Sequence, residues 1–149
     1  MNEPRDEYGA LLNLLLEAER AGARLLAAWV DELPPQSQAW QKLRAVQRDE
    51  ASNCAVLIHL LLQADIAPSM ATGDFYQKGL AIRVWRERVE FLNRGQAWVA
   101  RRIAAALPGI PSHEGRRLLE AMHESHLRNM VDGDALLGTP QHLASSNAA

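Results

Sequence analysis

Residues 12–30 read LNLLLEAERAGARLLAAWV, and their leucines and alanines recur at the three- and four-residue spacing of a helix that buries one face. Glu19 lies in the middle of this apolar face, where a purely structural helix carries leucine or alanine. Glu50 and His126 occupy the same kind of position in two further apolar stretches. Ionisable side chains on a buried face are costly unless they are paired, protonated or bound to a cation. The sequence therefore predicts that Glu19, Glu50 and His126 form one buried polar site.

Helical periodicity continues through most of the chain, and proline and glycine fall mainly between the periodic stretches. The pattern predicts an all-α protein with one domain over residues 1–138 and a flexible tail over residues 139–149. Ser112 is the predicted N-cap of the last helix. The predicted long helices cover about residues 6–32, 37–64 and 77–107, and the fourth runs from after Ser112 to between 133 and 138.

The connection between the second and third predicted helices decides the topology. It covers residues 66–75, and an extended segment of about ten residues spans roughly 33 Å. A helix of about 27 residues is roughly 40 Å long. With one frayed turn at either end, the connection can return along the whole bundle and leave these two helices parallel. We therefore expect a four-helix bundle with a long crossover between helices two and three; the alternative is a simple up-and-down bundle with a loose loop.

Composition and charge exclude several classes of protein. The chain has 149 residues, a formal net charge of −2 and scattered basic residues, so electrostatic binding of nucleic acid is not expected. Its apolar runs are shorter than the roughly 20 residues that cross a bilayer, and its start, MNEPRDEYG, lacks the layout of a signal peptide. A single cysteine, Cys54, allows no internal disulfide. We expect a cytoplasmic protein that binds neither nucleic acid nor membrane.

Residues 6–135 resemble the ferritin-like superfamily, which contains rubrerythrins, bacterioferritins and related di-iron carboxylate proteins. The resemblance rests on Glu19 in the first helix and on Glu50 in the second, within Glu50-Ala-Ser-Asn53. In that superfamily a Glu, a Glu-x-x-His, a Glu and a second Glu-x-x-His, one from each helix in turn, hold two metal ions. The resemblance implies a ferritin-like bundle with Glu19 and Glu50 as metal ligands. Asn53 stands where the superfamily has a histidine.

The fourth helix offers two registers for its ligands, Glu120-Ala-Met-His123 and His123-Glu-Ser-His126. With about 100° per residue, the apolar face centres close to His126, whereas His123 lies about 60° to one side and Glu120 over about 100° away. His126 and then His123 are therefore the expected inward groups.

The third helix gives two conflicting indications. The phase of its apolar residues places Arg88 near the centre of the inward face, Glu90 on the opposite face and Glu87 at its margin. The spacing to His123 and His126 instead matches Glu90 to the carboxylate of rubrerythrin-like proteins. Phase is the better guide to burial, so we expect Arg88 to point inward, and Glu87 and Glu90 are the alternative metal ligands.

Two functions follow from these residues. In the first, Glu19, Glu50 and His126, with or without His123, bind iron or manganese, and the resemblance implies oxygen, peroxide or iron redox chemistry. In the second, Arg88 neutralises Glu19 and Glu50, and the protein is a metal-free scaffold, dimerisation module or small-ligand pocket without a cofactor. The sequence does not decide whether the protein is an enzyme.

The first helix also predicts self-association. Its apolar residues cover well over half of its circumference, more than the core of a four-helix bundle needs. A homodimer is therefore expected, in which a second copy packs against Leu14, Ala21, Leu25 and Ala28.

Overall fold

The computed structural model describes residues 3–138, so the tail predicted at residues 139–149 lies outside the described residues. The described residues form helices and no strand, which confirms the all-helical class. None of these helices is long and apolar enough to cross a membrane. The elements are α1 (Glu3–Asp31), α2 (Gln38–Gln63), α3 (Phe75–Leu80), α4 (Trp85–Ala106), the 3-10 turn η1 (Leu107–Gly109) and α5 (His113–Gly138).

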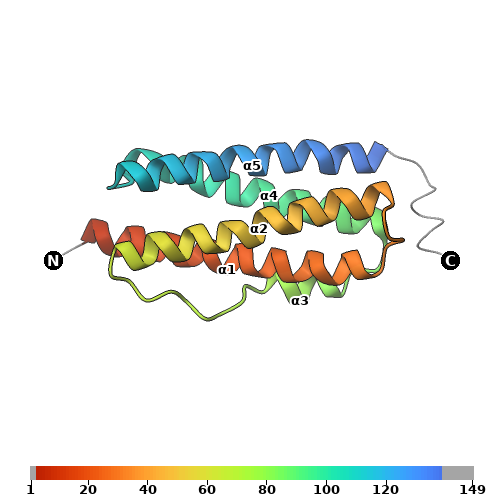
Figure 1. Ribbon diagram of the computed structural model, residues 1–149, viewed down its shortest axis with the longest axis horizontal. Helices are drawn as coiled ribbons and strands as arrows, with labels where there is room; N and C mark the ends of the chain where they lie inside the picture. The colour runs from red at the N-terminus through yellow and green to blue at the C-terminus, as the bar shows by residue number, and fades with distance from the viewer. Residues whose placement is uncertain (1–2, 139–149) are drawn as a thin grey trace.

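The four long helices lie side by side, as Figure 1 shows. Lys42 at the start of α2 pairs with Asp132 near the end of α5, at 3.4 Å, and His59 near the end of α2 lies 3.6 Å from Glu114 at the start of α5. Helices α2 and α5 are therefore antiparallel. The short connection through η1 makes α4 antiparallel to α5 as well. Hence α2 and α4 run in the same direction.

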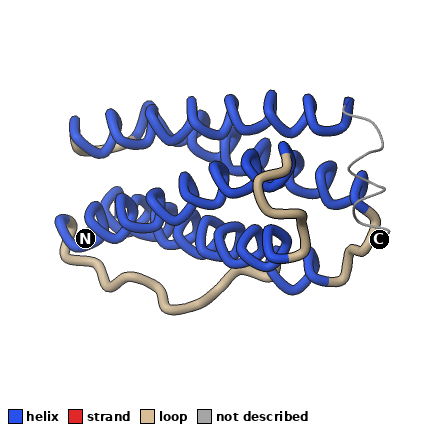
Figure 2. The backbone as a smooth tube through the Cα atoms, turned by 45° about the vertical axis from the view of Figure 1, so that its right-hand side comes forward, coloured by secondary structure: helices blue, strands red, loops and turns tan. Residues whose placement is uncertain are grey.

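Parallel α2 and α4 require a connection that returns along the molecule. Residues 64–74 run along the outside of α1 in both views (Figures 1 and 2). Side chains of α1 hold this segment: Asn13 Oδ1 accepts a hydrogen bond from the backbone N–H of Ser69 at 2.7 Å, and Glu17 Oε2 accepts from the Ser69 hydroxyl at 2.6 Å. The backbone N–H of Gly73 donates to the carbonyl of Glu17 at 3.1 Å. The connection therefore has a fixed course against α1.

The single third helix predicted at residues 77–107 is wrong. The chain forms the short α3, leaves the helix at residues 81–84 and starts α4 at Trp85, with Val84 extended at φ −90° and ψ 125°. The break turns the chain so that α3 packs on α1 and α4 pairs with α5. A Cβ at Gly79 would overlap the side chain of Leu25, so the close approach of α3 to α1 requires glycine there. No proline marks this break, which is why periodicity did not reveal it.

Two of the four α1 residues assigned to contact with a second copy are covered by the same chain. Ala21 and Leu25 are fully buried, and Gly73 of the connection and Gly79 of α3 lie against them. This part of the second apolar face of α1 therefore packs on the crossover and α3, whereas Leu14 and Ala28 are only partly buried. Homodimerisation stays a prediction, without this surface to support it.

Helix ends follow local capping rules. Ser112 Oγ accepts a hydrogen bond from the backbone N–H of Gly115 at 2.8 Å, which confirms the predicted N-cap of α5. Ser37 caps α2 in the same way through the N–H of Trp40. These caps fix where the chain turns and hence the level of each side chain along its helix.

The core consists of two separate apolar clusters. The first contains Leu16 and Leu57 among others, and the second contains Leu25 and Val46. On α1, α2 and α4 one buried polar residue lies in sequence between the helix's contributions to the two clusters, and on α5 there are three, of which His126 is the most buried and Ser125 and Asn129 flank it. We take one residue from each helix as the centre of this region. These four residues are Glu19 on α1, Glu50 on α2, Gln96 on α4 and His126 on α5.

Candidate functional site

We call Glu19, Glu50, Gln96 and His126 the polar layer. All four side chains are nearly inaccessible to solvent, with exposed fractions of 1%, 3%, 2% and 0%. The layer unites the three residues that the sequence singled out, each from a different helix. It adds Gln96, which sequence reasoning missed although Gln96 lies four residues after Leu92 and three before Val99, at the spacing of the buried face of α4.

Glu19 and His126 form the centre of the layer. Nδ1 of His126 lies 2.8 Å from the carbonyl oxygen of Met122, which can only accept, so Nδ1 carries a hydrogen. Nε2 lies 2.9 Å from Oε2 of Glu19. Burial disfavours a charge on the ring, but the charge of Glu19 and the hydrogen bonds with Glu19 and Met122 outweigh it and raise the pKa of His126. The pair is therefore best described as an imidazolium that donates to a carboxylate.

Asn53 occupies the second oxygen of Glu19. Its Nδ2 donates to Oε1 at 2.6 Å. Both oxygens of Glu19 thus have partners within the protein. The residue that replaces the histidine of the superfamily pattern serves here as a hydrogen-bond donor to Glu19.

Glu50 lies beside this pair with an incomplete set of partners. Its Oε2 is buried and has no hydrogen-bond partner within the protein. Burial, followed by the negative charges of Glu19 and Asp49, raises the pKa of Glu50 well above its usual range, and a hydrogen bond from Gln96 opposes this only in part. Glu50 therefore retains a proton at pH values where exposed glutamates are ionised.

Gly22 makes the position of Glu50 against α1 sterically feasible. A Cβ at Gly22 would overlap Oε1 of Glu50. We expect Gly22→Ala to lower the free energy of unfolding by about 1–3 kcal/mol, despite the higher helix propensity of alanine, because Glu50 has to move within a packed interior. Chemical denaturation would measure the loss. Gly109→Ala is the matched control, since a Cβ there meets no atom within 4 Å; equal losses in both variants would contradict this role of Gly22.

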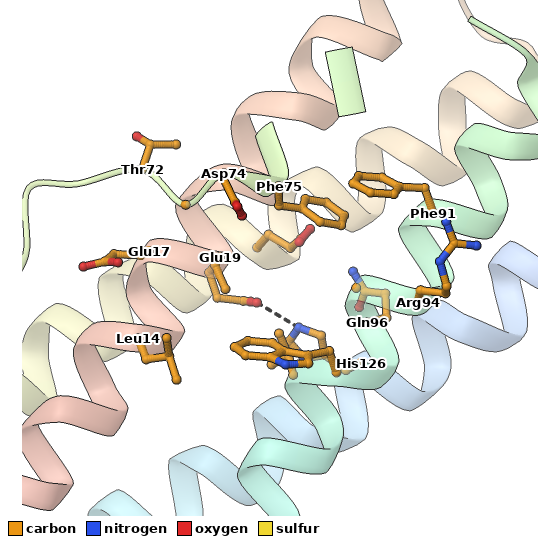
Figure 3. Close-up of a pocket in the computed structure, with 16 residues that line it drawn as sticks. Leu14, Glu17, Glu19, Thr72, Asp74, Phe75, Phe91, Arg94, Gln96 and His126 are labelled. Atoms are coloured by element: carbon orange, nitrogen blue, oxygen red, sulfur yellow. Dashed lines mark hydrogen bonds and ion pairs between the residues drawn. The ribbon is translucent and has the colours of Figure 1, made fainter. Parts of the chain in front are cut away.

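A pocket of about 580 Å³ adjoins the polar layer. Glu19, Glu50, Gln96 and His126 all line it, and Figure 3 labels Glu19, Gln96 and His126 among the lining residues. The remaining wall is largely apolar and aromatic, and it includes the crossover at residues 72–74, which the sequence did not assign to a site. The apolar lining residues are Leu14, Ala18, Phe75, Phe91, Trp98 and Val99.

Two aromatic rings form one wall of the pocket. Phe75 at the start of α3 stacks on Phe91 of α4, with 4.2 Å between ring centroids and 12° between ring planes. Asp74, Arg94 and Trp98 are exposed as well as pocket-lining, so they lie at its mouth. The break between α3 and α4 therefore shapes the pocket, because it brings Phe75 back to α4.

Arg88 is buried, as its helical phase predicts, but its predicted partners are wrong. Its guanidinium donates to Glu32 Oε1 at 3.1 Å and to the carbonyl of Ile82 at 2.7 Å, and it lies 5.3 Å from the ring centroid of Trp29. Arg88 precedes Gln96 by eight residues, about 12 Å along α4. It therefore lies near the N-terminal end of the helix rather than beside Glu19 and Glu50. Arg88 stabilises the break before α4 and does not balance the polar layer.

The other candidate ligands lie outside the layer. Glu90 is paired with Arg86 at 3.6 Å, with 42% of its side chain exposed, and Glu87 is exposed. His123 is half-buried and does not line the pocket. Among residues 3–138 no group of three or more His, Cys, Asp or Glu side chains is arranged to hold a metal ion. The six-ligand set implied by the resemblance does not fit, because Asn53 and Gln96 supply amides where that set has a histidine and a carboxylate.

Cys54 lies next to the polar layer, and its thiol is expected to be unreactive. Burial, followed by the charges of Glu19 and Glu50, raises the pKa of its thiol to about 11, and Arg20 only partly opposes them. A thiol with such a pKa is scarcely ionised at neutral pH, so Cys54 behaves as a small core residue.

Comparison with known proteins gives one match. A family model described as Domain of unknown function (DUF6306) matches residues 6–135, which include every residue of the polar layer and of the pocket. The comparisons found no match among curated proteins and none among solved structures.

Proposed function

Since the chain belongs to the DUF6306 family, whose description assigns no activity, we propose from the site itself that this protein binds a small molecule in the pocket beside the polar layer. One observation carries the proposal. The pocket of about 580 Å³ has mostly apolar walls and ends at a buried carboxyl group, Glu50, that has a free oxygen. Small-molecule sites have this size and this combination of apolar walls with a few placed polar groups.

We further propose that the helices have the ferritin-like arrangement, in which one long crossover joins two hairpins. The parallel direction of α2 and α4 and the course of residues 64–74 along α1 support it. The polar layer supports it too, because every long helix contributes a buried polar side chain to the lining of the same pocket.

Charge balance favours a small molecule over a pair of metal ions. Glu19 already has His126 and Asn53 as partners. Glu50 keeps its proton because of its burial. The layer is then neutral without any metal ion.

A single metal ion is the second candidate, and the geometry of His126 favours it. Histidine ligands usually donate one ring N–H to a carbonyl and bind the metal through the other nitrogen. Nδ1 of His126 faces the Met122 carbonyl, and Nε2 faces Glu19 beside the pocket. Glu19, Glu50 and His126 would hold iron or manganese, and the metal would supply redox chemistry.

Pocket filling tests the first candidate. We expect fragments detected by ligand-observed NMR to bind the wild-type protein and to lose binding in Ala18→Phe, because Ala18 lines the pocket. Ala27→Phe, on the exposed side of the same helix, is the matched control and should bind as the wild type does. Circular dichroism would establish that both variants fold.

Two results would contradict the small-molecule proposal. One is a set of fragments that bind the wild type and Ala18→Phe equally. The other is stoichiometric iron or manganese, measured by inductively coupled plasma mass spectrometry, that is retained on purification and lost in Glu50→Gln. The second result would establish the metal candidate instead.

A further inference from the structure

The charges around the pocket select the class of ligand. Its lining contains four carboxyl groups, those of Glu17, Glu19, Glu50 and Asp74, against two cationic side chains, Arg94 and His126. Arg94 is exposed at the mouth and lies over the ring of Phe91, at 5.9 Å from the centroid. The interior of the pocket is therefore more acidic than its mouth, and an anionic ligand is disfavoured.

At the acidic end of the pocket, the carboxyl group of Glu50 lacks a hydrogen-bond partner for one of its oxygens. Glu50 is 3% exposed, it lines the pocket and its Oε2 has no partner. The charged groups that act on it are Glu19 on α1 and Asp49 on its own helix, while α4 presents the neutral Gln96. His126 of α5 lines the same pocket. The imidazolium of His126 is already committed to Glu19. A positively charged ligand in the pocket would supply the missing partner of Glu50.

The side chains of the pocket walls indicate what kind of molecule carries this positive charge. The walls contain the aromatic rings of Phe75, Phe91 and Trp98 and the aliphatic side chains of Leu14 and Val99. Phe75 and Phe91 stack on each other, and Arg94 and Arg102 already lie over the rings of Phe91 and Trp98, at 5.9 and 5.5 Å from the centroids. Aromatic faces attract organic cations as well as apolar groups. A bare metal ion would use only the acidic end and leave these walls without a partner.

We infer that the ligand of this pocket is a small organic cation, an ammonium group on an apolar or aromatic body, held between the carboxyl end formed by Glu19 and Glu50 and the aromatic wall formed by Phe75, Phe91 and Trp98. This inference rests on the proposed small-molecule function and names its ligand class. Binding transfers the proton of Glu50 to solvent, so Glu19 and Glu50 as two anions balance His126 and the ammonium as two cations.

Isothermal titration calorimetry at pH 7 with two matched probes tests the inference. 2-Phenylethylamine is a cation at this pH, and 2-phenylethanol is its neutral counterpart. We expect the amine to bind at least about tenfold more tightly than the alcohol, as a charge-assisted hydrogen bond to a buried carboxylate provides. Titrations in two buffers of different ionisation enthalpy should show a net release of protons on binding of the amine.

Variants of matched charge locate the effect. Glu50→Gln should remove both the preference for the amine and the proton release, while Glu90→Gln, which removes a carboxylate outside the pocket, should keep both. If Glu50→Gln does not fold, proton release by the wild type in the two buffers still decides the matter.

The remaining outcomes separate this inference from the function on which it rests. Equal binding of amine and alcohol, or tighter binding of 3-phenylpropionate, would overturn the cation while leaving a small-molecule pocket. Binding of the amine without proton release would overturn the role of Glu50. No binding of any of these probes, together with no fragment that Ala18→Phe excludes, would overturn the pocket itself.

Discussion

His126→Leu is expected to lower the free energy of unfolding by about 3–5 kcal/mol at pH 7, the largest loss that we expect of any single change in this protein. The variant leaves the carboxylate of Glu19 buried with only Asn53 as a partner. For a domain of this size, each kcal/mol lowers the melting temperature by about 2–4 °C. Urea denaturation followed by circular dichroism would measure the loss.

His59→Leu is the matched control for this prediction. His59 is also a histidine facing a carboxylate, at 3.6 Å from Glu114, but 52% of its side chain is exposed. Exposed ion pairs contribute little, so its loss should stay below about 1 kcal/mol. The double variant Glu19→Leu, His126→Leu should recover much of the lost stability, because the uncompensated charge is then gone. A small loss in His126→Leu, comparable to that of His59→Leu, would contradict the buried ion pair.

Glu50→Gln is expected to make the protein more stable than the wild type at neutral and alkaline pH, by an amount that grows as the pH rises. The pKa of Glu50 is raised in the folded state, chiefly by burial and by the charge of Glu19. The folded state therefore binds this proton more tightly than the unfolded state, whose carboxyl group titrates near 4.5. The stability contributed by the proton is fully present below pH 4.5 and is lost as the pH rises through the folded pKa.

The difference between the two proteins should be small near pH 4 and should increase at up to about 1.4 kcal/mol per pH unit until Glu50 ionises in the folded state. Glutamine has no proton to lose, so the variant lacks this dependence. The raised pKa of His126 also makes stability fall with rising pH, above its usual value of 6.5, but that residue is present in both proteins. Urea denaturation at a series of pH values would measure the difference. A constant difference between pH 4 and pH 9 would refute the protonated state of Glu50.

A binding pocket gives a reason for the costly burial of Glu50 in the polar layer. A glutamate without a full set of partners is costly in a core, where leucine or alanine is the usual residue. Such local conflicts between sequence and fold are typical of functional sites. The site therefore accounts for a residue that folding alone does not require.

Much of what was predicted about the fold follows from the helical periodicity of the apolar residues. The four long helices, the N-cap at Ser112 and the burial of Glu19, Glu50, His126 and Arg88 follow from which residues share a helical face. These features depend on contacts within a few residues of one another, or on the burial of one face as a whole. Neither requires knowledge of which helix is the neighbour.

The identity of the partners could not be obtained in this way. Helical phase shows that Arg88 is buried, but its level along α4, set by the unmarked break before Trp85, decides that it contacts Glu32. The second apolar face of α1 is evident in the sequence, whereas its cover, the chain's own α3 rather than a second copy, depends on the path of the crossover.

By itself the sequence determined the four long helices, apart from the break before Trp85, with their buried faces and three of the four residues of the polar layer, because these follow from local backbone geometry and the cost of exposing apolar side chains. Only the tertiary structure decided that Asn53 donates to Glu19, that Gln96 completes the layer and that Phe75 returns to Phe91 to form a pocket. Those contacts join residues far apart in the chain, and their distances depend on the rotation and level of each helix against its neighbours. A shift of one helix by one residue, with the rotation of about 100° that goes with it, would give its side chains different partners. The sequence pattern would stay the same.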